Sequence, residues 1–349
     1  MGRKTQGVGV HKMTKIQVIG LGALNIDHIY KVERVLGDRE TAADKGHVEH
    51  VPKYREAKPK PAGTFPGGSA ANTIYGLAKL GVSTGFSGAV GDDEGGKMLL
   101  KDFEKVGVDT SQIKVKPEAE TGLARCFSDK LNFRSIHVTP GANSLLTTDD
   151  VDFEYMNQAE ILHISSFVDD KQLEVLLELV ARLDSSVKIG FSPGELYANK
   201  GLKDLNPILA RTYVLFVNEK EIEQLTGKDF QTGAEVCLKQ GCQIVVVTLG
   251  KGASYKTVTA TSYIRTNGNE YAIEPANKKI ISDLDTVGAG DAFAAGFIYG
   301  LLKKKNLVEC GWLGDIVAQF CIAKTGARQG LPTLNQLSKR YRQLYNQEL

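Results

Sequence analysis

The sequence predicts an α/β fold in which a mostly parallel central sheet lies between two layers of helices and carries a small β-sheet lid. From residue 160 onward, short apolar runs alternate with segments of helical length, which is typical of a parallel sheet covered on both faces. Two glycine-rich stretches, residues 67–72 and 285–293, lie far apart in the chain, and each is followed by a helical pattern.

The N-terminal part predicts strands, two helices and a hairpin. Residues 15–22 form a short apolar run that ends in glycine, and residues 25–32 alternate polar and apolar side chains like a half-exposed strand. Residues 38–62 are charged and contain three prolines, which indicates a surface excursion. The other elements expected here are helix 69–80, strand 82–90, helix 94–106, and the hairpin strands 122–128 and 133–139.

The C-terminal part carries the strand–helix alternation. The expected strands are 161–165, 187–191, 213–217, 244–249, 254–257, 261–265 and 271–274. The expected helices are 171–183, 205–211, 219–225, 233–240, 289–302, 311–324 and one from residue 335. We expect a single α/β domain over residues 13–340, a lid from about 28–55 and 120–140, and a disordered or tag-derived leader at 1–12.

Composition excludes several classes of protein. The 349 residues include 43 basic and 41 acidic side chains, which gives a net charge of +2. The sequence therefore lacks the excess of basic residues that indicates nucleic-acid binding. No apolar run approaches the length needed to span a bilayer. The five cysteines are scattered without CxxC spacing, which favours neither a disulfide framework nor a zinc site. We therefore expect a cytoplasmic protein that binds neither membranes nor nucleic acid.

The stretch from Asp285 to Phe293 combines glycines with one carboxylate at the start of an apolar helix. Asp291 is the only charged residue between Asp285 and Lys303. A helix start offers free N–H groups and partial positive charge, and glycines leave these groups open to an anion. An anion hole beside a carboxylate base suits phosphoryl transfer to a hydroxyl. The alternative is a glycine turn in which Asp291 is an ordinary helix cap.

Two other motifs predict chemistry only weakly. Residues 20–25 nearly match the dinucleotide GxGxxG pattern, but Asn25 replaces the third glycine and a strand-like segment follows. Residues 91–97 fit GxxxxGK, but Met98 stands where a hydroxyl should hold magnesium. A nicotinamide-dependent dehydrogenase is therefore only a distant alternative.

The two glycine-rich stretches together resemble the ribokinase-like (PfkB) carbohydrate and nucleoside kinase family. The matching blocks are Gly67-Gly68-x-x-x-Asn72 and Asp285-Thr286-Val287-Gly288-Ala289-Gly290-Asp291, and the resemblance extends over about residues 14–340. It implies the three-layer α/β/α ribokinase-like fold. It also implies that Asp291 is the general base and that the N–H groups of Gly288, Ala289 and Gly290 hold the charge of the moving phosphoryl group.

The resemblance also implies an acceptor site. In the family, an Asn and an Asp after the first strand and a Gly-Gly…Asn block hold the hydroxyls of the substrate. The matching residues here are Asn25, Asp27, Gly67, Gly68 and Asn72. The alternatives are a turn for Asn25 and Asp27 and a solvated helix position for Asn72.

A nucleotide site is implied by Asn218-x-x-Glu221, which resembles the family motif that faces the phosphates and the water shell of Mg²⁺. Glu221 would bind the metal through water, and Thr248 and Gly250 would contact the nucleotide together with Asn218, Gly288 and Gly290. The alternative for Asn218 and Glu221 is a capping box. The implied cofactors are ATP and Mg²⁺.

Asp285 is the candidate residue for a monovalent cation such as K⁺, together with carbonyl groups of Val287 and the 323–330 loop. The resemblance also allows a homodimer through the lid. We expect Arg125, Phe127, Phe133 and His137 of the lid to shape the acceptor pocket.

The leading interpretation is an ATP-dependent kinase that phosphorylates a primary hydroxyl of a nucleoside or a ribose-type sugar. The alternatives are a non-catalytic sugar or nucleotide sensor on the same fold and a fructokinase-like hexose kinase. Residues 191–195 lack the Asp-x-Asn-x-Arg pattern of many fructokinase-like members, while Gly141-Ala142-Asn143 looks ribokinase-like. The acceptor stays open between a nucleoside and a sugar.

Overall fold

The computed structural model describes residues 15–33, 39–42, 59–129, 134–275 and 285–349. The expected leader at 1–12, residues 34–38 and 43–55 of the first lid segment, and Phe133 lie outside the described residues.

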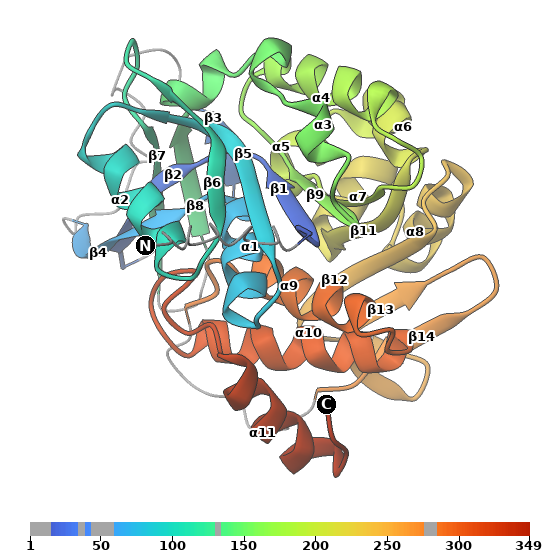
Figure 1. The fold of residues 1–349 in the computed structure, drawn as a ribbon. Coiled ribbons are helices and arrows are strands. Elements are labelled where there is room, and N and C mark those ends of the chain that lie inside the picture. Colours follow the sequence, from blue (N-terminus) through green and yellow to red (C-terminus); the bar gives the residue numbers. More distant parts are fainter. Residues whose placement is uncertain (1–14, 34–38, 43–58, 130–133, 276–284) are drawn as a thin grey trace, which may run out of the picture.

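The central sheet is nine-stranded and mostly parallel (Figure 1). Its strands are β1 (Val18–Leu21), β5 (Thr84–Gly91), β6 (Asp109–Lys116), β9 (Ile161–Ser165), β10 (Lys188–Ser192), β11 (Thr212–Asn218), β12 (Ile244–Tyr255), β13 (Val258–Arg265) and β14 (Glu270–Ile273). They lie in the order β14-β13-β12-β11-β10-β9-β1-β5-β6. The seven strands from β12 to β6 pair in parallel, and β13 and β14 add an antiparallel edge.

Helices cover both faces of this sheet, as Figure 1 shows. One layer contains α1 (Ser69–Lys79), α2 (Glu94–Glu104), α9 (Ala289–Leu302), α10 (Leu307–Ile322) and α11 (Leu334–Tyr345). The other contains α3 (Phe153–Met156), α4 (Asp170–Arg182), α5 (Gly194–Ala198), α6 (Gly201–Leu209), α7 (Glu219–Thr226) and α8 (Phe230–Lys239). Strand β11 shows why there are two cores: Val214 and Phe216 pack with the first layer, and Leu215 and Val217 pack with the second. The predicted three-layer α/β/α fold is confirmed.

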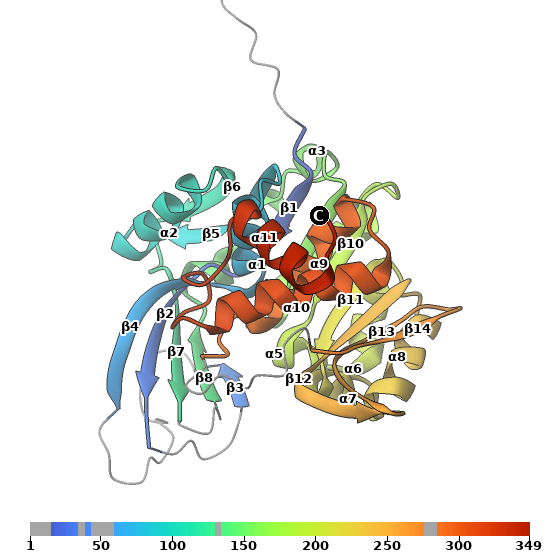
Figure 2. The same cartoon turned by 90° about the horizontal axis from the view of Figure 1, so that it is seen from below.

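A second, five-stranded sheet forms the lid and projects from one end of the central sheet (Figure 2). Its strands are β2 (Asn25–Lys31), β3 (Arg39–Ala42), β4 (Lys60–Gly67), β7 (Gly122–Ser128) and β8 (Arg134–Thr139), in the order β3-β8-β7-β2-β4. Strands β7 and β8 pair antiparallel as the predicted hairpin. Strand β4 begins inside the predicted surface excursion and carries two prolines, which are tolerated because β4 lies at the edge of the sheet.

Helix α9 occupies the middle of its layer, and it begins and ends at the predicted residues. It is apolar on nearly every face because it packs against α1, α10 and β11. Glycines allow the close approach of α10: a Cβ at Gly296 would lie 2.4 Å from the carbonyl oxygen of Leu313. The predicted helix at 311–324 in fact begins at Leu307, behind an Asn306–Glu309 capping box.

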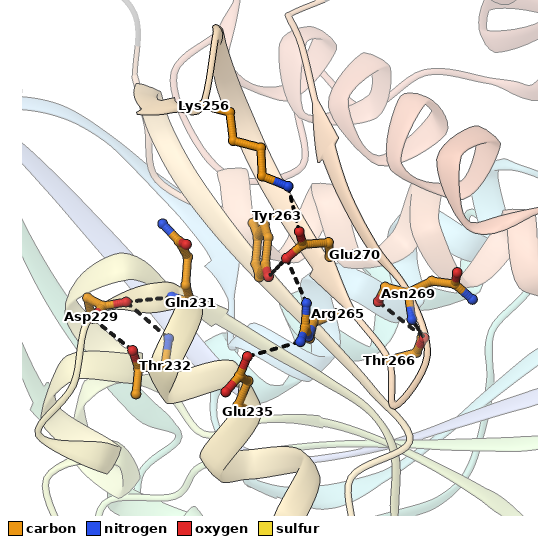
Figure 3. Close-up of polar contacts among 10 residues, drawn as sticks. All are labelled: Asp229, Gln231, Thr232, Glu235, Lys256, Tyr263, Arg265, Thr266, Asn269 and Glu270. Atoms are coloured by element: carbon orange, nitrogen blue, oxygen red, sulfur yellow. Dashed lines mark hydrogen bonds and ion pairs between the residues drawn. The ribbon is translucent and has the colours of Figure 1, made fainter.

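The antiparallel edge is held by a network of charges around Glu270 (Figure 3). The Glu270 carboxylate accepts hydrogen bonds from Lys256 Nζ, Tyr263 Oη and Arg265 Nη1, each at 2.7 Å. Arg265 also pairs with Glu235 of α8 at 2.9 Å, so the network joins the sheet edge to a helix. Hydrogen bonds from Lys256 first of all, and then from Tyr255 and Tyr263, lower the pKa of Glu270 to about 2.

One histidine lies in the core of the central sheet. His163 of β9 is fully buried, and neither ring nitrogen has a hydrogen-bond partner among the described residues. Burial lowers its pKa to about 3, so the imidazole is neutral in the folded protein near neutral pH.

The helices in the described residues are all too short or too polar to cross a membrane.

Candidate active site

A small cleft of about 90 Å³ lies where the carboxyl ends of β10 and β11 and the end of the parallel part of β12 meet the first turns of α1 and α9. Ligands of open α/β sheets bind at this end of the strands. The cleft is lined by Ser69, Ser192, Gly194, Phe216, Val217, Asn218, Glu221, Thr248, Gly290 and Asp291. It therefore brings together five of the residues expected at the site: Asn218, Glu221, Thr248, Gly290 and Asp291.

A larger hollow of about 430 Å³ lies beside the start of α10 and contains none of the expected site residues. Its lining is Tyr271, Asn306, Leu307, Val308, Glu309, Trp312 and Gln347. The smaller cleft is the candidate site because it alone of the two contains a carboxylate at a glycine-rich helix start.

The first turn of α9 depends on its glycines. Gly288 has a φ of 75°, and a Cβ there would lie 2.4 Å from the Cβ of Ala327. Gly290 is exposed, and a Cβ there would meet nothing within 4 Å, so its backbone borders open space. As the second residue of the helix, Gly290 has no acceptor for its N–H group within the helix. The N–H group of Ala289 differs, since it donates to the carbonyl oxygen of Thr286 at 3.2 Å.

Asp291 is held by side chains of α1. Ser69 Oγ donates to Asp291 Oδ1 at 2.7 Å, and Asn72 Nδ2 donates to Oδ2 at 2.9 Å. Thr73 Oγ1 donates to the backbone oxygen of Asp291 at 3.2 Å. The three donors follow i, i+3, i+4 spacing, which places them on one face of the helix. The glycine-rich block indicates only Asn72, whereas the i, i+3, i+4 spacing in the sequence also indicates Ser69 and Thr73.

Asn25 and Asp27 lie at the start of lid strand β2, and each is 7% exposed. The alternative of a turn is therefore wrong for both. Asn25 Oδ1 accepts a hydrogen bond from Asn143 Nδ2 at 3.0 Å. Asn143 also binds both backbone groups of Leu24, with N–O distances of 2.8 and 3.0 Å. The Gly141-Ala142-Asn143 segment, which resembles ribokinases in sequence, therefore anchors the junction between the central sheet and the lid.

Gly67 and Gly68 pack where no side chain fits. A Cβ at Gly67 would lie 2.1 Å from Asp27 Oδ1, so this glycine lets the Asp27 carboxylate approach the backbone. Gly68 has a φ of 98°, and a Cβ there would lie 2.1 Å from the carbonyl oxygen of Ala23. The two glycines therefore bring β4, β2 and α1 together at the end of β1.

Asn72 is 4% exposed, so the alternative of a solvated helix residue is wrong. Its amide lies between Asp291 and the guanidinium of Arg328, whose Nε donates to Asn72 Oδ1 at 2.8 Å. For Arg328, the family resemblance implies only a backbone carbonyl group in the 323–330 loop. The contact of its side chain with Asn72 cannot be read from the sequence, because the two residues are 256 positions apart.

Asn218 and Glu221 form the capping box of α7. Glu221 N donates to Asn218 Oδ1 at 2.8 Å, and Asn218 N donates to Glu221 Oε2 at 2.9 Å. Both residues also line the cleft, so the cap and a ligand-binding role are compatible. Thr248 lies beside Asn218 in the sheet, and Gly250 has a φ of 57° in the irregular stretch of β12 that follows. Their contacts with a nucleotide stay a prediction.

Asp285 is 6% exposed and joins the start of α9 to the 323–330 loop. Its Oδ1 accepts from the N–H group of Val287, and its Oδ2 accepts from the N–H group of Gly326, each at 3.1 Å. The carboxylate therefore organises the expected cation loop, and the cation itself stays a prediction.

Three of the lid side chains expected to shape the acceptor pocket lie on the face opposite Asp27. Strand pairing places Ala124 beside Asp27 and Arg125 beside His28, so Arg125 faces away from Asp27. Phe127 and His137 share the face of Arg125. The Asp27 face carries the buried apolar cluster Ile29, Ala124, Cys126 and Val138. The contribution of the opposite face to an acceptor pocket stays a prediction.

Comparison with known proteins identifies the family. The family model for pfkB family carbohydrate kinases matches residues 15–334. The chain is 39% identical over 257 residues to a protein of Archaeoglobus fulgidus named uncharacterized sugar kinase, covering 74% of this chain and 98% of that protein. It is 27% identical over 330 residues to the ribokinase of Staphylococcus aureus, covering 93% of this chain and 99% of that protein.

Solved structures share the fold. The adenosine kinase of Sinorhizobium meliloti has a TM-score of 0.78 at 21% identity, covering 95% of this chain and 99% of that chain. The ribokinase of Thermotoga maritima has a TM-score of 0.74 at 23% identity, covering 94% of this chain and 99% of that chain. The resemblance read from the two glycine-rich blocks is thus confirmed. The chain belongs to the pfkB family of carbohydrate kinases and is an ATP-dependent sugar kinase.

Proposed function

We propose that this kinase transfers the γ-phosphoryl group of ATP to a primary hydroxyl of a nucleoside or a ribose-type sugar, with Asp291 as the general base. The observation that carries the proposal is the position of Asp291. It lies one residue beyond Gly290 in the first turn of α9, lines the cleft, and is oriented by Ser69 and Asn72.

The proton and the phosphoryl group move at adjacent points of this helix start. Asp291 accepts the proton of the acceptor hydroxyl as the new P–O bond forms and the bond to the leaving ADP breaks. The backbone at Gly288, Ala289 and Gly290 bears the partial positive charge of the helix start, which stabilises the charge on the transferred group. The donors on Asp291 fix the direction of its carboxylate, so the hydroxyl meets a preorganised base.

Mg²⁺ would be held mainly by nucleotide phosphates and water. The described residues contain no group of three or more His, Cys, Asp or Glu side chains able to hold a metal ion. That agrees with a metal that keeps several waters and binds few protein oxygens, with Glu221 reached through water. When bound, Mg²⁺ neutralises phosphate charge. Asn218, Thr248 and Gly250 would orient the nucleotide, and Asp285 would support a K⁺ site with the 323–330 loop.

The acceptor would lie at the lid junction. Asn25, Asp27 and Asn72 offer short amide and carboxylate groups that pair with neighbouring hydroxyls, and Gly67 and Gly68 let the sugar approach the backbone. The apolar Asp27 face of the lid suits an uncharged ring more than a charged group. A lid closed over this ring would exclude water and limit hydrolysis of ATP, and pairing of two lids would form a homodimer.

A coupled ADP-release assay tests the proposal with adenosine, inosine, cytidine, ribose and fructose as acceptors. We expect acceptor-dependent ADP release with a nucleoside or with ribose, and a higher kcat/KM than with fructose. Binding of these compounds without ADP release from any of them would instead indicate a sensor and contradict the proposal.

A further inference from the structure

One buried guanidinium connects the two sides of the candidate site. We propose that Arg328 is a positioning residue of this kinase: it acts through Asn72 to orient the base Asp291 and through Gly67 to fix the acceptor side. The proposal rests on the proposed role of Asp291. Arg328 is 3% exposed, and its guanidinium donates hydrogen bonds to Asn72, Asp102 and the backbone oxygen of Gly67.

The guanidinium determines which way the Asn72 amide faces. Arginine has only donors, so it requires the Oδ1 atom of Asn72, which accepts from Arg328 Nε at 2.8 Å. The NH₂ group of Asn72 must then face Asp291 Oδ2, at 2.9 Å. In a flipped amide, the NH₂ group would face the donors of the guanidinium, and the oxygen would face the acceptor oxygens of the carboxylate. Neither hydrogen bond could then form. Without Arg328, nothing on that side selects the orientation that donates to Asp291.

The site needs arginine because three acceptors lie in different directions around one buried charge. Arg328 Nη1 donates to Asp102 Oδ2 at 2.9 Å, and Nη2 donates to the carbonyl oxygen of Gly67 at 3.0 Å. The planar fork reaches all three acceptors at once, whereas a lysine ammonium is a compact charge that cannot. Asp102 balances the charge, and the rings of Tyr75 and Phe103 lie 5.2 Å from the guanidinium carbon.

The same residue also supports the acceptor side. The Gly67 carbonyl that accepts from Arg328 belongs to the residue on which the Asp27 carboxylate packs. Burial lowers the pKa of Arg328, while the nearby charges of Asp102 and Asp27 oppose that shift. Arg328 thus links α1, α2, the end of β4 and the loop after α10, so a change here moves the base and the acceptor site together.

The test is a double-mutant cycle on kcat with the full chain. We expect Arg328→Met to lower kcat about 10- to 100-fold, because small misplacements of catalytic groups cost factors of this size. If Arg328 acts on the base through Asn72, the same change made in Asn72→Ala should lower kcat by no more than about 3-fold, because the effects of residues that act as a unit are not additive. Its effect through Gly67 falls on the acceptor side and should raise the acceptor KM in both backgrounds.

A folding defect is separated from positioning by a second variant. Arg328→Met alone leaves the Asp102 carboxylate without its main partner, whereas the Asp102→Leu/Arg328→Met double variant replaces the pair by apolar side chains, which is often neutral for stability. We expect the double variant to recover the Tm lost in Arg328→Met without recovering kcat. Arg328→Lys keeps the positive charge, and its kcat should still be lower than that of the wild-type enzyme.

Arg265→Met is the matched control, since it removes an ion-paired arginine on β13 that touches none of the site residues. It should lower Tm and leave kcat and KM unchanged. The proposal would be overturned by a wild-type kcat in Arg328→Met, or by an equal fold-loss of kcat on this change with Asn72 and with Ala at position 72. Recovery of kcat together with Tm in the double variant would also overturn it. Asp291→Asn, assayed in parallel, reports separately on the base assignment, so the failure of one proposal is distinguishable from the failure of the other.

Discussion

Gly290→Ala should make the protein more stable and less active. Gly290 lies in the first turn of α9, and a Cβ at this position would meet no atom within 4 Å. The substitution therefore creates no clash in the protein. The same methyl group would enter the cleft that Gly290 lines, where we propose that the transferred phosphoryl group lies.

The size of each effect follows from this geometry. Alanine in place of glycine in a helix stabilises by up to about 1 kcal/mol, because the unfolded chain loses conformational freedom. The methyl group would hold a phosphate oxygen away from the N–H groups of the helix start, and losing one such donor costs about 100-fold in kcat. We therefore expect a small rise in the free energy of unfolding together with a loss of kcat of at least about 10-fold.

Urea unfolding and steady-state kinetics measure the two effects on the same protein samples. Gly288→Ala is the contrasting variant, because its φ of 75° and the 2.4 Å approach to the Cβ of Ala327 should cost stability as well as activity. Wild-type kcat and nucleotide KM in Gly290→Ala would show that the bare backbone of this residue is not needed, and would refute the reasoning.

Three further predictions concern acid stability and the orientation of the base. His163 is neutral when folded and protonates below pH 6.5 when unfolded, so the free energy of unfolding should fall by about 4 kcal/mol between pH 6.5 and 3. His163→Leu should remove this contribution to the slope in urea titrations at each pH. Glu270 has a folded pKa of about 2, so its contribution to the free energy of unfolding is present above pH 4.5 and is lost toward pH 2. Glu270→Gln should lower the free energy of unfolding by about 1 kcal/mol at pH 7 and leave kcat unchanged. A loss of kcat would contradict its structural role. Ser69→Ala removes one donor to Asp291 and should lower kcat about 10-fold in the ADP-release assay, while an unchanged kcat would show that Asn72 alone orients the base.

The sequence predicted those parts of the fold whose signals are local. Helix α9 matches its predicted bounds because a glycine-rich start and a continuous apolar segment follow one another in the chain. The edge strand β4 was missed, since prolines and charges indicate a loop unless the strand is known to lie at an edge. Strand β6 was also missed: its residues are mostly half-exposed, which leaves little apolar pattern.

The candidate site shows the same limit. The glycine-rich blocks indicated Asn72 and Asp291 separately, but the hydrogen bond between them joins residues 219 positions apart. Arg328 lies in a loop without a distinguishing pattern, and only packing brings it to Asn72 and Asp102. The directions of the lid side chains could not be predicted, because the face on which a strand residue lies follows from the pairing register, which no local pattern fixes.

The most direct measurement is the single-turnover rate of Asp291→Asn with ATP and the preferred acceptor, together with the Kd of that acceptor. Asparagine keeps the size of the side chain and removes its ability to take a proton. The account predicts a rate lower by at least about 1000-fold with an acceptor Kd within a few-fold of wild type. A rate equal to that of the wild-type enzyme would contradict it.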